Sequence, residues 1–451
     1  MLLIQNAAAI VTCDNTDTVY HNASMLINGR EIVAIGNATA AWAADAHIET
    51  FNAQGMAVFP GLINTHHHLY QTFSRNMPAL QNMELFDWLK ASYLIWQNLN
   101  EDVAYYSSLA GLGELLKNGC TTSADHHYVF PHGAGDITAA QFAASELLGM
   151  RLHAARGSMD VSKKDGGLPP DSVVETIDQI LKAGEDAVHR FHDSSRFSMK
   201  QVFLAPCSPF SVSAELLRAT ALQARELGVR LHTHLAETRD EEAYTLERFG
   251  MRPLAYMENV GWLGSDVWYA HGIHFNDQEL TLLAQTGTGV AHCPTSNMKL
   301  ASGVACLPEM LAQGVTVGLA ADSSTCGSDN LLEELRVGFL LHRLSSSSKA
   351  PSAYDMLKVA TRGSAQLLGR TDLGSLEAGK AADFFLVDLE RFACIGACDD
   401  IAALPGTVGL KAPADYVFVN GRMAVEQGCL CTIDEKETVA KSKPVLERYR
   451  A

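Results

Sequence analysis

Strand-like and helix-like segments alternate from about residue 57 to about residue 370, and this alternation is the strongest constraint on the fold. In the clearest unit, an apolar run at 202–206 precedes a helical pattern that begins at Ser213 and ends at Gly228, and a second strand-like run follows at 229–235. Ser is a favoured helix N-cap and Gly a favoured helix end, so this unit is a βαβ step. About 310 residues of such steps favour a (β/α)8 TIM barrel, with an open doubly wound sheet as the alternative.

Short β-prone runs lie before and after this region. The first contains Asn28-Gly29 and the second Asn420-Gly421, and Asn-Gly is a strong β-hairpin signal. Beyond Arg370 the helical period stops. We therefore expect an α/β protein in which residues 57–370 form the barrel domain. Residues 1–56 and 371–451 are expected to form one small β-sandwich domain from both ends of the chain.

The charge balance excludes several classes of partner. Lys and Arg number 34 and Asp and Glu 51, so the formal charge is −17 and would repel the phosphates of nucleic acid and anionic membrane surfaces. The first basic residue is Arg30, and no apolar run approaches the roughly 18 residues of a spanning helix, so we expect a cytoplasmic protein. The 10 cysteines include no Cys-x-x-Cys pair, which argues against a disulfide framework or a thiolate zinc site. Assembly into a homo-oligomer stays open.

Histidine and aspartate side chains occur where several predicted strands end. The residues concerned are His66, His68, His234, His271 and Asp322. In a barrel, the carboxyl ends of the strands meet at one face, so these side chains should converge. Because side chains alternate along a strand, His66 and His68 should point the same way and His67 the other way. Neutral imidazole and carboxylate suit Zn2+ or Fe2+, and three His with one Asp is the layout of a catalytic metal site.

These motifs, in this order, resemble those of the amidohydrolase superfamily, in the branch that deaminates aromatic heterocycles. The stretch 60–68 (PGLINTHHH) resembles the strand-one metal motif, and 234–237 (HLAE) resembles the strand-five motif. The stretches 360–369 (ATRGSAQLLG) and 374–383 (GSLEAGKAAD) are similar to the closing helix and the return to the β domain. The resemblance covers essentially the whole chain.

The resemblance implies roles for individual residues. His66, His68, His234 and Asp322 would bind one divalent metal, Zn2+ first and Fe2+ as the alternative. Glu237 would act as the general acid and base, His271 would orient the attacking water, and Asp322 would also relay a proton to the leaving ammonia. A second metal would need a bridging Lys or Glu, and the stretch 202–210 has neither.

Further stretches are similar to the 8-oxoguanine deaminases of this branch, which implies hydrolysis of an amino-oxo purine to urate and ammonia. These stretches are 68–72, 124–131, 156–159, 165–170 and 204–211. The candidate substrate contacts are Gln71, Arg156 and Trp88. Each of these residues also has an alternative role that does not involve substrate. Gln71 could be a surface amide, and Arg156 could form a structural ion pair. Trp88 could pack in the core, together with Phe86 and Tyr93.

The segment after the metal aspartate departs from the expected pattern. Residues 322–330 read DSSTCGSDN. Because the loop from Ser323 to Asn330 departs from the pattern, the identity of the heterocyclic substrate stays open. The alternatives are isoxanthopterin or guanine deamination and triazine hydrolysis, and outside the enzymes a catalytically silent scaffold of the same fold. His126 and His127 follow the second predicted strand and either line the pocket or are structural.

Overall fold

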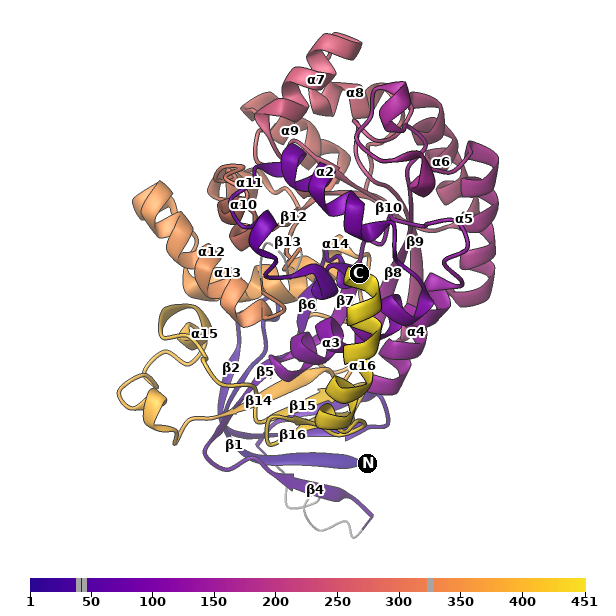
Figure 1. The fold of residues 1–451 in the computed structure, drawn as a ribbon. Helices are drawn as coiled ribbons and strands as arrows, with labels where there is room; N and C mark the ends of the chain where they lie inside the picture. Colours follow the sequence, from indigo (N-terminus) through magenta and orange to yellow (C-terminus); the bar gives the residue numbers. More distant parts are fainter. Residues whose placement is uncertain (38–41, 43–46, 323–327) are drawn as a thin grey trace.

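Eight parallel strands form the central sheet of the protein, which we describe from a computed structural model covering residues 1–37, 42, 47–322 and 328–451 (Figure 1). They pair in the order in which they occur in the chain: β6 (Leu62–Asn64), β7 (Cys120–Asp125), β8 (Arg151–Ser158), β9 (Lys200–Pro206), β10 (Leu231–Leu235), β11 (Val267–His271), β12 (Gly289–His292) and β13 (Val317–Leu319). The Thr65 amide donates to the Leu319 carbonyl at 3.1 Å, which brings the first and last strands together. The predicted (β/α)8 barrel is therefore confirmed.

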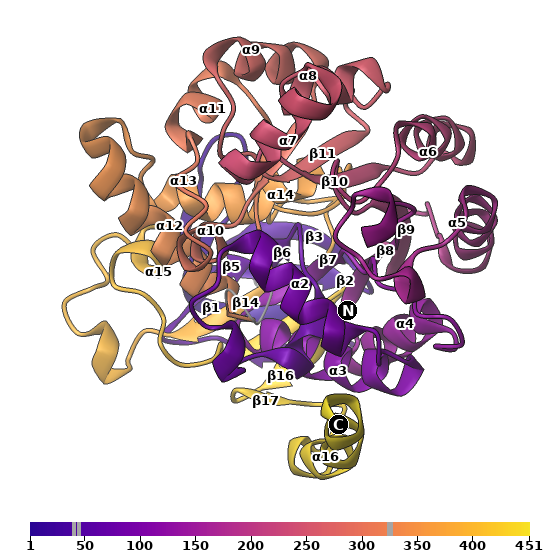
Figure 2. The same ribbon diagram turned by 45° about the horizontal axis from the view of Figure 1, so that its top comes forward.

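Helices surround this sheet, as the view in Figure 2 shows. They are α2 (Leu85–Trp96), α3 (Glu101–Lys117), α4 (Ile137–Leu148), α5 (Ile177–Phe191), α6 (Ala214–Leu227), α7 (Arg239–Phe249), α8 (Pro253–Asn259), α9 (Asp277–Thr286), α10 (Pro294–Lys299), α11 (Leu307–Gln313), α12 (Leu331–Ser346), α13 (Ala353–Lys358) and α14 (Ser364–Leu367). The predicted caps of α6 are present: Ser213 Oγ accepts from the Leu216 amide at 3.1 Å, and Gly228 ends the helix with φ +68°. Shorter helical turns are η1 (Leu69–Ser74), η2 (Pro78–Leu80), η3 (Lys163–Asp165), η4 (Asp171–Val173), η5 (Ser347–Lys349) and η6 (Val359–Gly363).

The two ends of the chain share a second, mixed sheet below the barrel in Figure 1. Its strand order is β17 (Cys429–Leu430), β16 (Arg422–Glu426), β15 (Tyr416–Val419), β14 (Phe384–Asp388), β5 (Met56–Pro60), β1 (Leu2–Val11), β2 (Val19–Asn28) and β3 (Glu31–Gly36), and β4 (Glu49–Asn52) also pairs with β1. The N-terminal and C-terminal strands meet where β5 pairs with β14. The rings of Phe59 and Phe385 stack there with centroids 5.2 Å apart. Both predicted Asn-Gly turns join neighbouring strands, β2 to β3 and β15 to β16.

A buried arginine joins the barrel to this terminal sheet. Arg151, on β8, is fully buried and forms an ion pair with Asp383. It also donates to Asn420 Oδ1 at 2.8 Å and to Thr122 Oγ1 at 3.0 Å. The donors of this guanidinium therefore reach residues of both sheets. The limits 1–56, 57–370 and 371–451 stay predictions, and β5 extends the terminal sheet to Pro60.

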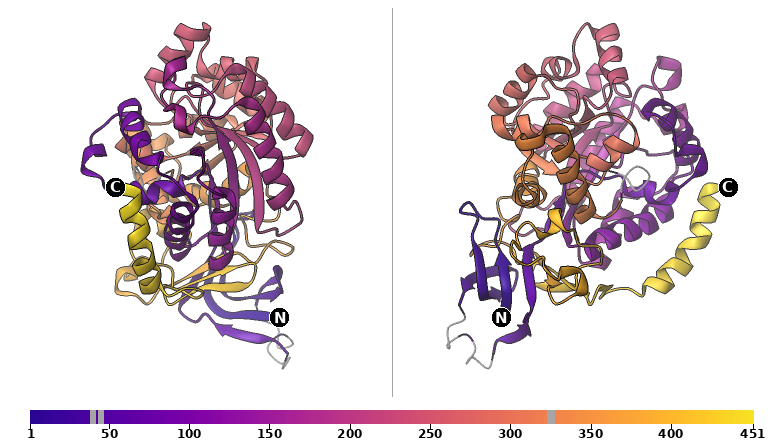
Figure 3. Two further views of the ribbon diagram at one scale, coloured as in Figure 1. Left: turned by 45° about the vertical axis from the view of Figure 1, so that its right-hand side comes forward. Right: turned by 90° about the vertical axis from the view of Figure 1, so that its left-hand side faces the viewer.

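The expectation that helices stop after Arg370 is wrong. Beyond it lie η7 (Phe392–Cys394), α15 (Leu404–Thr407) and the 16-residue helix α16 (Glu435–Arg450). The side chain of Asp434 caps α16 by accepting from the Glu437 amide at 3.0 Å. Only Val445 and Tyr449 of this helix are buried, so its apolar period is weak. In Figure 3, α16 stands at one side of the molecule, and its residues contact α3.

Within the described ranges, none of the helices is both long enough and apolar enough to cross a membrane.

Candidate active site

The barrel brings the strand-end motifs together at the carboxyl ends of its strands. His66 and His68 follow β6, His234 lies on β10, His271 ends β11, and Asp322 follows β13. The Asp322 amide donates to the His66 carbonyl at 3.1 Å, and the His68 amide donates to the Asp322 carbonyl at 2.8 Å. These two bonds fix the aspartate beside the two histidines.

Two of these residues have a left-handed backbone. His271 has φ +71° and Asp322 φ +60°, a backbone that is uncommon outside glycine, although Asn, Asp and His adopt it more often than other residues. Such conformations cost of order 1–3 kcal/mol each and cluster at functional sites. Backbone hydrogen bonds to His66 and His68 hold Asp322 in this conformation.

Three imidazoles and one carboxylate meet in a buried cluster. Asp322 Oδ1 lies 3.2 Å from His66 Nε2 and 3.3 Å from His68 Nε2, and His68 Nε2 lies 3.1 Å from His234 Nε2. His66 Nε2 is buried and makes no hydrogen bond to any described residue. Converging imidazole nitrogens and a carboxylate oxygen are the donors that a divalent metal takes. Among the described residues, two overlapping groups have donor atoms within 4.8 Å of one another: His66, His68, His126 and His234, and His66, His271 and Asp322. The four predicted ligands are all found in these groups, so they fit a metal site.

Backbone carbonyls fix the tautomers of two of these histidines. His68 Nδ1 donates to the His126 carbonyl at 2.7 Å, and His234 Nδ1 donates to the Cys207 carbonyl at 2.6 Å. A carbonyl only accepts, so in each neutral ring the proton is on Nδ1 and the lone pair is on Nε2. Burial lowers the pKa of His234 to about 3, which keeps that ring neutral. Both rings present a free lone pair to the cluster.

Proton-carrying groups surround the same point. Burial raises the pKa of Glu237 to about 7, and its Oε2 lies 3.6 Å from His271 Nε2. Burial lowers the pKa of His271, but the nearby carboxylates Glu237 and Asp322 outweigh it and raise that pKa overall. His271 Nδ1 donates to Asn297 Oδ1 at 2.9 Å, and the Ser296 hydroxyl donates to Asp322 Oδ2. A carboxyl group with a pKa near neutrality can both accept and donate a proton.

A pocket with aromatic and aliphatic walls opens onto these groups. Gln71 and Trp88 line it, as do Leu85, Leu89, Tyr128 and Phe210. Gln71 is fully buried and donates to the Tyr70 hydroxyl at 3.3 Å, so it is not a surface amide. The Trp88 ring also packs edge-on against Trp96 with centroids 5.3 Å apart, so it belongs to both the core and the pocket wall.

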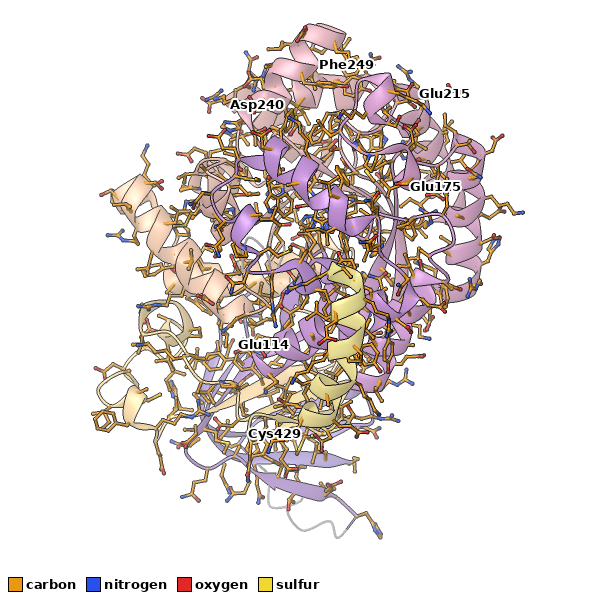
Figure 4. All side chains as sticks on the ribbon, in the orientation of Figure 1. Glu114, Glu175, Glu215, Asp240, Phe249 and Cys429 are labelled. Carbon is orange, nitrogen blue, oxygen red and sulfur yellow. The ribbon has the colours of Figure 1, made fainter. Side chains whose placement is uncertain are left out.

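The structure does not bring Arg156 to this pocket. Its guanidinium donates to both carboxylate oxygens of Glu175, at 2.7 and 2.8 Å, and lies 3.7 Å from the centre of the Phe130 ring. Glu175 lies on the side of the barrel near α5 (Figure 4). Of the two predicted alternatives for Arg156, the ion pair is the one observed.

The other histidines of the motifs also make contacts with the protein, although His126 Nδ1 is buried and makes no hydrogen bond to any described residue. His126 Nε2 donates to the Ala205 carbonyl at 2.9 Å, and His127 Nε2 donates to the Val129 carbonyl at 2.7 Å. His67 points away from His66 and His68, as the strand alternation predicts, and its Nε2 lies 2.8 Å from Asp329 Oδ1. In the divergent loop that follows Asp322, residues 323–327 lie outside the described residues.

Sequence reasoning missed several residues that support the site. Glu241 accepts from the amides of Ala236 at 2.8 Å and Glu237 at 3.1 Å, and so holds the segment that carries the proton-transfer carboxyl. His232 lies against His66. The spacing of His232 to His234 repeats that of His66 to His68, and this signal was available in the sequence. No spacing connects Glu241 with the site.

Comparisons with known proteins agree with this geometry. The sequence model of the amidohydrolase family matches residues 57–426. The chain is 41% identical over 441 residues to the 8-oxoguanine deaminase of Pseudomonas aeruginosa strain PAO1, with 98% of this chain and 97% of that protein covered. It is 39% identical to the hydroxydechloroatrazine ethylaminohydrolase of Pseudomonas sp. strain ADP, with 97% and 94% covered. The solved structure of atrazine chlorohydrolase TrzN from Arthrobacter aurescens TC1, complexed with zinc, has a TM-score of 0.93 at 33% identity, with 99% of this chain and 100% of that chain covered.

These matches extend over nearly the whole chain, so they concern the complete fold and not one motif. They support the prediction that the protein is a hydrolase acting on carbon–nitrogen bonds. The His and Asp side chains at the barrel mouth lie close enough together to hold a metal ion. The chain therefore belongs to the amidohydrolase family.

Proposed function

We propose that the protein is a metal-dependent deaminase of an amino-oxo purine, and that it converts 8-oxoguanine and water to urate and ammonia. The observation that carries the proposal is the pocket itself. A buried amide, Gln71, and an indole, Trp88, line the same cavity as Glu237, His271 and Asp322. A flat heterocycle needs such walls and a few polar groups to orient its ring edge. The 41% identity to an 8-oxoguanine deaminase supports this choice of substrate.

We further propose that His66, His68, His234 and Asp322 hold one divalent metal, with Zn2+ as the native ion. When bound, such a metal lowers the pKa of water and so supplies a nucleophile at neutral pH. The second predicted function of Asp322, relay of a proton to ammonia, is compatible with its contacts, because the Ser296 hydroxyl orients Oδ2.

In the proposed reaction Glu237 transfers the first proton. It takes a proton from the attacking water and gives it to the ring nitrogen beside the amine-bearing carbon. His271 donates a hydrogen bond that orients the water, and its own ring is held by Asn297. Asp322 takes the remaining proton from the hydroxyl group now on that carbon and delivers it to the departing amine. Ammonia leaves, and the ring carbon keeps the oxygen of the water as a carbonyl. The amide of Gln71 binds the carbonyl-bearing edge of the ring, and Trp88 covers one face.

A substrate panel with ammonia release as the readout tests this function. We expect 8-oxoguanine to exceed guanine by at least roughly tenfold in kcat/KM, since one buried hydrogen bond to a carbonyl is worth about 1–3 kcal/mol. Isoxanthopterin should follow, with adenosine, cytosine and chlorinated triazines far behind. Purified protein should carry about one equivalent of metal, and a chelator should abolish the activity.

Other results of the substrate panel and of the metal analysis would contradict parts of the proposal. A lead for isoxanthopterin, guanine or a triazine would contradict the proposed substrate and leave the hydrolase chemistry in place. Protein with one equivalent of metal that releases no ammonia from any of these compounds would support the silent scaffold instead. Two tightly held metals for each chain would contradict the proposed single-metal site.

A further inference from the structure

His232 lies against His66, one of the four predicted metal ligands, and has no role in the function proposed above. It is fully buried on β10, two residues before His234, so both side chains point to the same face of the strand. Its ring stacks on the indole of Trp268, with centroids 4.4 Å apart and an interplanar angle of 20°. On its other side the ring of His66 stands edge-on at 4.9 Å. These contacts leave the His232 ring in one orientation.

Both ring nitrogens of His232 have a partner. Nδ1 lies 2.9 Å from the Trp268 carbonyl, which accepts only, so Nδ1 carries a proton. Nε2 lies 2.7 Å from His66 Nδ1. A positively charged His232 ring would need a carboxylate partner at this buried place. Both of its nitrogens are bonded to neutral groups instead, the Trp268 carbonyl and the His66 ring. The His232 ring is therefore neutral, and its Nε2 accepts.

This arrangement determines the state of the next ring. Because His232 Nε2 accepts, His66 Nδ1 must donate, and the lone pair of His66 is on Nε2. That nitrogen is the one that lies 3.2 Å from Asp322 Oδ1. A relay of two hydrogen bonds thus runs from the backbone of β11 through His232 to His66.

We infer that His232 is a positioning residue that fixes the tautomer and orientation of His66 for metal binding. The inference rests on the metal site of the proposed function. Backbone carbonyls do the same for His68 and His234, and substitution does not remove them. At His66 a side chain has this role. The strength of one metal ligand therefore depends on a residue that itself has no contact with the metal.

Two amide substitutions separate the two nitrogens of His232. In His232→Gln, the terminal amide reaches the place of Nε2 and its oxygen can accept from His66. In His232→Asn, the shorter amide imitates Nδ1 only, so His66 loses its acceptor. Loss of such an outer partner of a metal-binding histidine typically weakens metal binding about 10–100-fold. We expect this loss for His232→Asn and a change of less than about threefold for His232→Gln.

The measurement is Zn2+ affinity of the full-length protein, by competition with a chromogenic chelator, so it needs no substrate. The control is His342→Asn, which replaces another fully buried histidine, on α12, whose partner is His292. This control should bind Zn2+ like the wild type. Circular dichroism and thermal unfolding of the metal-free proteins show whether each variant folds. If His232→Asn does not fold, His232→Met replaces it, because Met fills similar space and is only a weak acceptor.

Either of two results of the affinity measurement would overturn the inference. One is wild-type Zn2+ affinity in His232→Asn, and the other is a loss of Zn2+ affinity in His232→Gln equal to that in His232→Asn. Failure of the proposed function looks different, because the wild-type protein would then bind no Zn2+ or release no ammonia. At saturating Zn2+, His232→Asn should recover kcat, since His232 acts through His66 and touches no reacting atom. A kcat that stays low at full metal occupancy would also contradict a positioning role.

Discussion

Burial raises the pKa of Glu237 to about 7, so this carboxyl group can exchange protons near neutral pH. Glu237→Gln keeps the size and polarity of the side chain but cannot carry a proton. Metal content should therefore persist, and kcat should fall by about 10²–10⁴-fold. Elemental analysis and steady-state kinetics check both parts. Glu242→Gln is the control, because Glu242 pairs with Arg252 outside the pocket lining. Near-normal turnover in Glu237→Gln would remove this residue from the mechanism.

Gln71 offers a separate test of substrate orientation. Gln71→Leu keeps the volume of the side chain but removes the amide that lines the pocket. We expect kcat/KM for 8-oxoguanine to fall about 5–150-fold, which corresponds to one lost hydrogen bond of about 1–3 kcal/mol. The same substitution at the exposed Gln81 should have no effect. Equal kcat/KM values for the wild type and Gln71→Leu would show that the amide does not hold the ring.

The metal ligands could be predicted because they follow from two local rules, strand alternation and the convergence of strand ends. His67 illustrates the precision of the first rule, since it turns to Asp329 while its neighbours face Asp322. Arg156 illustrates the limit. The partner of its guanidinium, Glu175, is 19 residues away and no spacing rule connects them. Side-chain partners outside repeating elements depend on the folded structure.

Helix α12 carries a buried carboxyl group that makes stability depend on pH. Burial raises the pKa of Glu334 to about 8, and its side chain accepts from the Thr295 amide at 3.1 Å, which joins α12 to α10. Between about pH 4.5 and 8 the folded protein keeps a proton that the unfolded chain releases. The contribution of Glu334 to stability is therefore present at low pH and is lost as the pH rises through this window.

Glu334→Gln should remove this part of the pH dependence. Relative to the wild type, the variant should gain stability as the pH rises from about 4.5 to about 8, by up to about 1.4 kcal/mol for each pH unit. Urea unfolding at several pH values measures the difference. The exposed Glu258→Gln serves as the control and should give the slope of the wild type. A stability difference between Glu334→Gln and the wild type that is independent of pH would show that the carboxyl group does not titrate in this window.

Elements with a strong apolar period could be predicted from the sequence, and α16 shows why others could not. The caps of α6 agree with the predicted ones, because Ser213 and Gly228 mark the two ends of this helix. Helix α16 is mostly polar and packs through Val445 and Tyr449 against the cluster that includes Trp88 and Trp96. Its position depends on contacts with α3 and η1, which are distant in the sequence, so no pattern near residue 435 predicts it.

The junction between the barrel and the terminal sheet depends on Arg151. Arg151→Met keeps the aliphatic stem but leaves the Asp383 carboxylate buried without its partner. Breaking a buried ion pair from one side costs about 3–5 kcal/mol, and we expect the free energy of unfolding to fall by that amount. Arg225→Met removes the more exposed pair with Asp266 and should cost no more than about 1 kcal/mol. Denaturant unfolding compares the two, and similar small losses would show that the junction does not depend on Arg151.

The architecture as a whole was predictable to the level of a barrel and a shared terminal sheet. The alternation of strand-like and helix-like segments over residues 57–370 predicts the barrel, and the two Asn-Gly turns indicate the terminal sheet. The pairing of β5 with β14 and the contact of β6 with β13 join residues hundreds of positions apart, so no local pattern reports them. These long-range pairings are the part of the fold that the structure adds.

The pairing of β5 with β14 also determines when the terminal sheet can be completed while the chain is synthesised on the ribosome. Residues 61–383 separate the two strands, and at about 5–20 residues per second their translation takes roughly 15–65 s. During this time β5 has β1 on one side and an unpaired edge on the other. Such an edge is a template for pairing with other chains until β14 emerges. The last strands to leave the ribosome complete the sheet that the first strands began.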